Sequence, residues 1–253
     1  MAYTTINKHT DYFNTVLYTG DGNATQAITN TFQTDFSWIK DRGVTAAHTL
    51  QDAVRGFDVT KKLSSNSTDA ENNSSGATWG NYGGVTAVGA TSFTTSLGSN
   101  TPYQTNANGS NYVSWNWKAA GTSGSANSDG SVASTVSVNT TAGFSIVKWT
   151  GTGATATVGH GLGAKPSIVL IKNTGATENW VMYHSSLTAE KNLKLNNQEA
   201  AQDTTGAFND TEPTSSVFTV HTNTNTNQNG QVMIAYCFAE KTGYSKFGIY
   251  EGN

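Results

Sequence analysis

Val113-Ser114-Trp115-Asn116-Trp117 recurs later in the chain as Ile234-Ala235-Tyr236-Cys237-Phe238, 121 positions further on. In the first copy, large side chains alternate with small polar ones, as in a β-strand that has one face in a core. Trp115 and Trp117 are two positions apart, so they lie on the same face of such a strand. Because Tyr236 and Phe238 stand at the equivalent places, the pattern favours core packing over a binding face for these rings.

Four further phrases recur in the same order, which predicts an internal repeat. They are Tyr18-Thr19-Gly20-Asp21-Gly22 with Trp149-Thr150-Gly151-Thr152-Gly153, Trp38-Ile39-Lys40-Asp41-Arg42-Gly43 with Leu170-Ile171-Lys172-Asn173-Thr174-Gly175, Lys61-Lys62-Leu63-Ser64-Ser65-Asn66 with Lys191-Asn192-Leu193-Lys194-Leu195-Asn196, and Ser92-Phe93-Thr94 with Val217-Phe218-Thr219. The separation falls along the chain, which indicates about ten extra residues in the first copy. We place these extra residues near Trp79-Gly80-Asn81-Tyr82-Gly83-Gly84.

The repeats divide the chain into modules. We expect a first β-sandwich repeat at 1–118 and a second at 139–240, joined by 119–138, which combines a Gly/Ser/Asn-rich linker with a strand at 131–138. Lys246 to Gly252 aligns with Ser145 to Gly151, so 241–253 reads as the first strand of a truncated third repeat. One larger sandwich built from both halves is the alternative.

The composition agrees with an all-β class. Hydrophobic residues make up 36% of the 253 residues and charged residues only 12%, while Thr, Asn, Ser and Gly dominate most stretches. Threonine, valine and aromatic residues favour strands, and windows typical of helices are nearly absent. Ten Phe, ten Tyr and six Trp exclude charge-driven disorder.

Charge and cysteine content exclude several further classes. A net charge of −3 and a pI of about 5.9 argue against a nucleic-acid partner. No apolar run is long enough for a membrane span, and the single cysteine, Cys237, excludes a disulfide framework. The start of the sequence lacks the pattern of a signal peptide, so we expect folding in a cytoplasm with stability from packing alone.

The sequence offers no catalytic, metal or cofactor motif. The five histidines have no metal-binding spacing, and Gly159-His160-Gly161-Leu162-Gly163 lacks the lysine and helix of a phosphate loop. Asp52, Asp58, Asp69 and Glu71 are scattered without a paired arrangement, so glycan hydrolysis is a weaker alternative. Calcium through Asp21, Asp41 or Asp129-Gly130 is conceivable, but turn aspartates are the better account. We therefore predict a protein that is not an enzyme and has no cofactor.

One candidate binding site lies in the copy-specific insertion. Trp79, Asn81 and Tyr82 stand among Gly and Asn residues, where a loop would leave their side chains exposed. An exposed aromatic ring beside amide groups can hold a sugar by stacking and directional hydrogen bonds. These three residues are the candidate glycan contacts.

Several phrases together resemble tandem-repeat virion structural proteins, tail-fibre-like proteins among them, of tailed phages of marine bacteria, including cyanophages. The phrases are Tyr18 to Gly22, Trp38 to Arg42, Val54-Arg55-Gly56, Leu63 to Asn66, Tyr112 to Ala119, Asn139 to Val147, Gly159 to Gly163 and Ala235 to Glu240. The resemblance covers nearly the whole chain. It implies jelly-roll or lectin-like sandwiches and no catalytic residues.

The resemblance also implies a function and partners. We expect a non-enzymatic component on the virion surface, made in the host cytoplasm: a tail fibre or a receptor-binding component, or alternatively a capsid decoration or head-fibre protein. The other class left open is a carbohydrate-binding module or glycan hydrolase. Expected partners are further copies of the chain, with a trimer favoured, other virion proteins and a host-surface glycan.

The tail is the predicted site of self-association. A strand without a neighbour is a hazard unless another chain or module covers its edge. Phe247, Ile249 and Tyr250 are therefore the candidate strand-pairing residues, in this module or in a neighbouring subunit.

Overall fold

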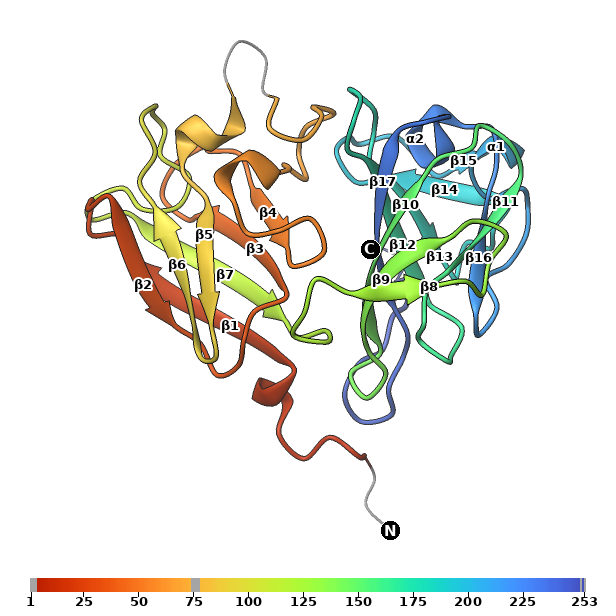
Figure 1. Ribbon diagram of the computed structural model, residues 1–253, viewed down its shortest axis with the longest axis horizontal. Helices are drawn as coiled ribbons and strands as arrows, with labels where there is room; N and C mark the ends of the chain where they lie inside the picture. Colours follow the sequence, from red (N-terminus) through yellow and green to blue (C-terminus); the bar gives the residue numbers. More distant parts are fainter. Residues whose placement is uncertain (1–3, 74–77, 251, 253) are drawn as a thin grey trace. The chain divides into compact units, whose positions relative to one another are not determined.

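A computed structural model describes residues 4–73, 78–250 and 252 of the chain and contains almost only strands and turns (Figure 1). It forms two compact units. One holds Lys8–Ser123 together with Thr174–Glu178, and the other holds residues 4–7, Gly124–Asn173 and 179–250. The predicted all-β sandwich class is confirmed.

The first repeat, drawn from red to yellow-green in Figure 1, consists of two antiparallel sheets around one core. The larger sheet has, in spatial order, β1 (Phe13–Thr19), β7 (Asn111–Trp117), β3 (Phe36–Asp41) and β4 (Thr49–Asp52). The smaller has β2 (Thr25–Thr29), β6 (Ser92–Ser96) and β5 (Val85–Gly89). Three short 3-10 helices lie in the connections: η1 (His9–Asp11), η2 (Val59–Lys61) and η3 (Trp79–Tyr82). Ile39 and Tyr112 of the larger sheet pack with Ile28, Val85 and Phe93 of the smaller.

The second repeat, drawn from green to blue, has an eight-stranded sheet and a two-stranded one. The large sheet runs β15 (Gln202–Asp203), β14 (Lys191–Lys194), β13 (Val181–His184), β12 (Ile168–Asn173), β17 (Val232–Phe238), β10 (Phe144–Thr150), β9 (Ser134–Asn139) and β8 (Ser125–Asn127). The small sheet pairs β11 (Ala156–Gly159) with β16 (Val217–Val220), beside the single-turn helices α1 (Thr205–Phe208) and α2 (Thr224–Asn227). Val147, Val169 and Ala235 of the large sheet share the core with Val158 and Phe218 of the small one.

The predicted internal repeat reappears in six strands of each unit. The order β1-β7-β3-β4 of the first unit matches β10-β17-β12-β13 of the second, and β2-β6 matches β11-β16. Even the register is the same, because Phe13 pairs with Trp117 where Phe144 pairs with Phe238. The recurring phrase that begins at Val113 and at Ile234 forms the interior strand of each sheet, with a neighbour on both sides. This position explains why most residues of both copies are buried.

A buried asparagine fixes the same turn in both repeats. The Asn106 side chain accepts a hydrogen bond from the backbone N–H of Asp21 (3.1 Å) and donates to the Asp21 carboxylate (3.0 Å) and the Asn23 carbonyl (2.9 Å). Asn227 makes the corresponding three bonds to Thr152 and Ala154. Both asparagines are fully buried. No sequence pattern distinguishes these two residues, because a lone Asn in a chain so rich in polar residues carries no characteristic spacing.

The glycines of the Tyr/Trp-Thr-Gly-x-Gly phrase are explained by the same turn. A Cβ on Gly20 would lie 2.2 Å from the Ala107 carbonyl oxygen, and one on Gly151 would lie 2.2 Å from that of Gln228. The backbone of this turn therefore passes directly against the loop that leads into the interior strand. Only glycine allows this approach.

Two expectations about the connections are wrong. Residues 119–130 are not only a linker, because Ser125–Asn127 form β8, an added strand of the second unit. Within the single chain the tail forms no extra strand, so pairing inside its own module is wrong, while pairing in a neighbouring subunit stays a prediction: Lys241 and Ser245 make an isolated bridge, and 246–250 have no strand structure. The reason is topological, since the chain leaves β17 where β10 and β12 already occupy both of its sides. The strand predicted at 131–138 is confirmed as β9, and it pairs with β10 within its own unit.

Replacing either buried asparagine tests the importance of this turn. We expect Asn106→Ala and Asn227→Ala each to lower the free energy of unfolding by about 2–4 kcal/mol, since three buried hydrogen bonds are lost. Chemical denaturation measures the change. Asn108→Ala, at an exposed position two residues away, is the control and should change stability by less than about 0.5 kcal/mol. Equal stability of all three variants would contradict the role given to Asn106 and Asn227.

Candidate functional site

Trp79 is not exposed, so the expectation that its ring is free to stack on a sugar is wrong. Only 6% of the residue is accessible. It begins η3, whose turn folds the ring inward, and Lys62 lies over it with Nζ 5.7 Å from the ring centroid. A cation over an indole face is a favourable contact. The insertion thus adds a packed turn to the first repeat where an open loop was expected.

Lys62 holds this turn from the inside. Its ammonium group is completely buried and donates to the carbonyl oxygens of Gly83 (2.8 Å) and Trp79 (3.3 Å) and to the side-chain oxygen of Gln104. Burial lowers the pKa of Lys62 well below its usual value. Through these hydrogen bonds Lys62, which follows η2, links the η3 turn to the loop before β7 inside the first repeat.

Asn81 and Tyr82 lie beside Trp79 and are half-buried. The Asn81 carbonyl accepts hydrogen bonds from the backbone N–H groups of Ser99 and Asn100, both at 2.7 Å. The Tyr82 ring centroid is 6.2 Å from that of Trp79. The structure therefore brings the three predicted residues together, but only Asn81 and Tyr82 keep side-chain surface for a ligand. The glycan contact stays a prediction for these two.

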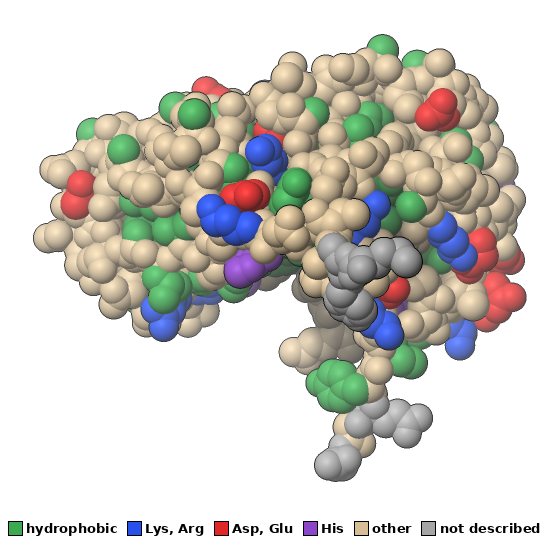
Figure 2. All heavy atoms as spheres, turned by 90° about the horizontal axis from the view of Figure 1, so that it is seen from below, with side chains coloured by type: hydrophobic (Ala, Val, Ile, Leu, Met, Phe, Trp, Pro, Cys, Tyr) green, Lys and Arg blue, Asp and Glu red, His purple; other side chains and the backbone are tan. Residues whose placement is uncertain are grey.

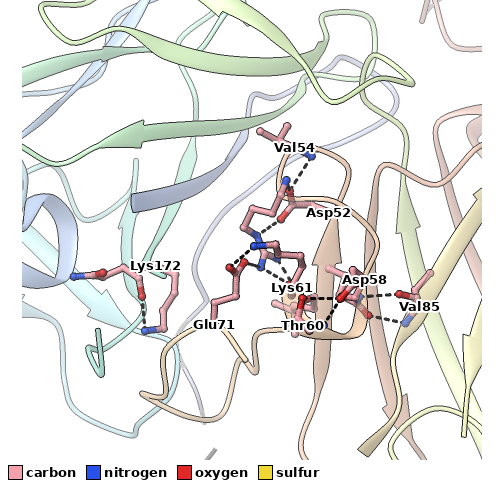
Figure 3. Close-up of polar contacts among 12 residues, drawn as sticks. Asp52, Val54, Asp58, Thr60, Lys61, Glu71, Val85 and Lys172 are labelled. Carbon is pink, nitrogen blue, oxygen red and sulfur yellow. Dashed lines mark hydrogen bonds and ion pairs between the residues drawn. The ribbon is translucent and has the colours of Figure 1, made fainter. Parts of the chain in front are cut away.

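A network of charged side chains braces the same part of the first repeat (Figure 3). Arg55 contacts Asp52 through Nε (2.6 Å) and Glu71 through Nη1 (2.9 Å), and Lys61 reaches the second oxygen of Glu71 at 3.2 Å. The side chains of Asp52 and Arg55 are almost completely buried. Asp52 also accepts from the backbone N–H groups of Val54 and Arg55.

This network accounts for two features of the sequence. It gives the Val54-Arg55-Gly56 phrase a structural role, since Arg55 joins the end of β4 to Glu71. In it, Arg55 also forms ion pairs with both Asp52 and Glu71, two of the carboxylates that were candidates for glycan hydrolysis. A glycosidase pair must instead face a sugar from both sides of the scissile bond. Asp58 caps η2 by accepting from the Thr60 N–H at 2.7 Å.

His160, in the Gly-His-Gly-Leu-Gly phrase, is buried in the second unit. Its Nδ1 accepts a hydrogen bond from the Leu162 N–H (3.2 Å), and its Nε2 lies 3.3 Å from the Thr214 carbonyl oxygen. These partners fit a neutral ring that carries its proton on Nε2. Burial lowers the pKa of His160, although the Thr214 carbonyl and Asp129 partly oppose the shift.

Within 4–73, 78–250 and 252, no three His, Cys, Asp or Glu residues gather as metal ligands, and no helix is long and apolar enough to cross a membrane. Cys237 is buried, and burial raises its pKa to about 12. On the face shown in Figure 2, the backbone and side chains that are neither charged nor hydrophobic predominate, and charged side chains appear in small scattered groups.

The tail residues differ in their surroundings. The Phe247 ring is half-buried, 6.1 Å from that of Phe238, and its N–H donates to Glu240 (3.2 Å). Ile249 is 69% exposed and Tyr250 93% exposed. They are the two most exposed large hydrophobic residues in the described part of the chain.

Fold and site together define a tandem-repeat β-sandwich protein in which one candidate site residue, Trp79, is buried, while the other candidates keep accessible surface. The chain belongs to the family described as a domain of unknown function, DUF7483, whose model matches residues 8–253. The match includes both repeats and the tail. No curated protein and no solved structure matches the chain.

Trp79→Ala tests whether the ring is a packing residue. We expect it to lower the free energy of unfolding by about 3–5 kcal/mol, the usual cost of removing a buried aromatic side chain, and Trp79→Phe to lower it less. Tyr82→Ala, at a half-buried neighbour, should cost less than Trp79→Ala and is the better variant for testing glycan binding. Unchanged thermal stability of Trp79→Ala would contradict the packing role.

His160 predicts a pH dependence of stability. Because its pKa is lowered in the folded chain, the unfolded chain takes up the proton first as the pH falls below 6.5, the usual value. Stability is therefore full above the unfolded pKa and falls, by at most about 1.4 kcal/mol per pH unit for this residue, until the folded pKa is reached. Denaturation at a series of pH values measures this slope. His160→Asn should flatten it, and an unchanged slope would show that His160 is not the cause.

Proposed function

We propose that this chain is a non-enzymatic structural protein of a phage virion, exposed on the particle as part of a tail fibre or receptor-binding component. The observation that carries the proposal is the duplication of one six-strand sandwich framework, in which an equivalent buried asparagine, Asn106 or Asn227, fixes the same turn. Repetition of one unit extends a protein without a new fold. The resemblance of its phrases to virion proteins supports the same reading.

The use of the charged side chains favours a structural role over an enzymatic one. Asp52 and Glu71 are bound to Arg55, and Lys62 is bound to carbonyl oxygens inside the first repeat. Such contacts stiffen a domain that contains no disulfide. The alternative of a carbohydrate-binding module or glycan hydrolase receives less support, because Trp79 is buried.

The proposal includes the partners and the location. We propose that the chain associates with further copies of itself, as a trimer, and with other virion proteins at the virion surface, where a host glycan would be its external ligand. A capsid decoration or head-fibre protein has the same structural requirements and is the second candidate within this class.

Sedimentation of particles tests the proposed function. An antibody against the recombinant chain should detect it in particles purified from the phage that encodes it, and gold-labelled antibody should mark the tail under the electron microscope. Label on the capsid would instead assign the decoration role. Recovery of the chain only in the soluble fraction of the lysate, with none in infectious particles, would overturn the proposal.

A further inference from the structure

The first strand of the first repeat pairs with one strand, whereas the first strand of the second repeat pairs with two. In the second unit, β10 lies between β17 and β9. In the first unit, the equivalent β1 pairs with β7 alone and stands at the end of its sheet. The part of the first repeat equivalent to β9 is 3–8, and its described residues, 4–8, form no strand. Among the residues that the structure describes, no strand therefore lies on the side of β1 that corresponds to the β9 side of β10.

The backbone of β1 is arranged to accept such a neighbour. Lys118 donates to the Tyr12 carbonyl and Gly20 donates to the Ser110 carbonyl, so the even-numbered residues of this stretch bond to β7. Because bonding alternates along an antiparallel strand, the N–H and C=O groups of Phe13, Thr15 and Leu17 point to the open side. Leu17 is also 62% exposed. An edge of this kind is a template for another strand.

The tail has the complementary features of a donor strand. In β9, the apolar residues Val136 and Val138 alternate with polar ones, and Val136 is buried in the core beside β10. In the tail, Phe247 and Ile249 alternate with Lys246 and Gly248 in the same way. The tail is prevented from pairing beside β17, where it emerges, because both sides of that strand are taken.

We propose that residues 246–250 of a second copy of this chain pair with the open side of β1, in the place that β9 takes beside β10. Main-chain hydrogen bonds would supply the affinity, and Phe247 and Ile249 would cover the half-buried edge of the first core beside Val16. The inference deepens the self-association contained in the proposed function. Since the two surfaces differ, the contact is head-to-tail, and it either closes into a ring such as a trimer or grows into a filament.

Two variants of the full-length chain test the two sides of this contact independently, one in the acceptor strand β1 and one in the donor segment 246–250. Thr15→Pro removes an N–H that points to the open side and leaves the bonds to β7 in place. Ile249→Lys places a charge in the donor segment. Light scattering after size-exclusion chromatography should show multiples of 26.7 kDa for the parent chain and a single chain for each variant. A mixture of the two variants should form dimers and nothing larger, because only one acceptor and one donor remain intact.

A matched control comes from the other sheet of the same repeat. Thr25 is also an exposed threonine on an end strand, β2, and its N–H also points away from its neighbour, because Leu97 bonds to Ala24. Thr25→Pro should assemble like the parent chain, and circular dichroism should show the same folded signal for all variants. A parent chain that stays monomeric at its highest soluble concentration, or assembly that survives Thr15→Pro, would overturn the inference. Neither result would bear on whether the chain sediments with virions, so the two proposals fail separately.

Discussion

In each repeat, the turn after the first strand lies directly against the loop that leads into the interior strand, β7 or β17. This backbone contact fixes how the two sheets of the sandwich are placed relative to each other. No side-chain atom fits at Gly20 or Gly151, so the backbones meet directly. The polar groups that this contact removes from water are satisfied by one buried amide, that of Asn106 or Asn227. Both sheets of a repeat take their relative position from this point, since the turn leads from the larger sheet to the smaller one. Its preservation in both copies, while most surrounding side chains differ, identifies it as the common constraint.

The two repeats differ at the position of Lys62. The first repeat has two buried cations around η2: Arg55, between two carboxylates, and Lys62, among carbonyl oxygens. At the position equivalent to Lys62 the second repeat has Asn192, a neutral residue that donates to the carbonyl oxygen of Gln202 in β15. Buried charges of this kind contribute little net stability, because desolvation offsets the attraction. Their contacts link the η2 and η3 segments to β4 and to the loop before β7.

The sequence was sufficient for the parts of the fold that depend on local pattern. Alternation in the phrases at Val113 and Ile234 predicts strands, and their recurrence predicts that the two sheets share an order, as β7 and β17 show. The burial of Trp79 could not be predicted, because it depends on Lys62, whose long-range contacts leave no spacing signal. The tail was expected to form a strand from its likeness to Ser145–Gly151. Whether a strand forms also depends on a free neighbour, and that is a property of the completed sheet.

The only thiol of the chain is that of Cys237, in β17, an interior strand of the eight-stranded sheet of the second repeat. Cys237 has no accessible surface, and its raised pKa keeps it protonated at neutral pH. The folded protein therefore behaves toward thiol reagents as though it had no cysteine. A cysteine introduced at any exposed position would be the single reactive group, so a probe or cross-linker could be attached there without altering the native sequence elsewhere.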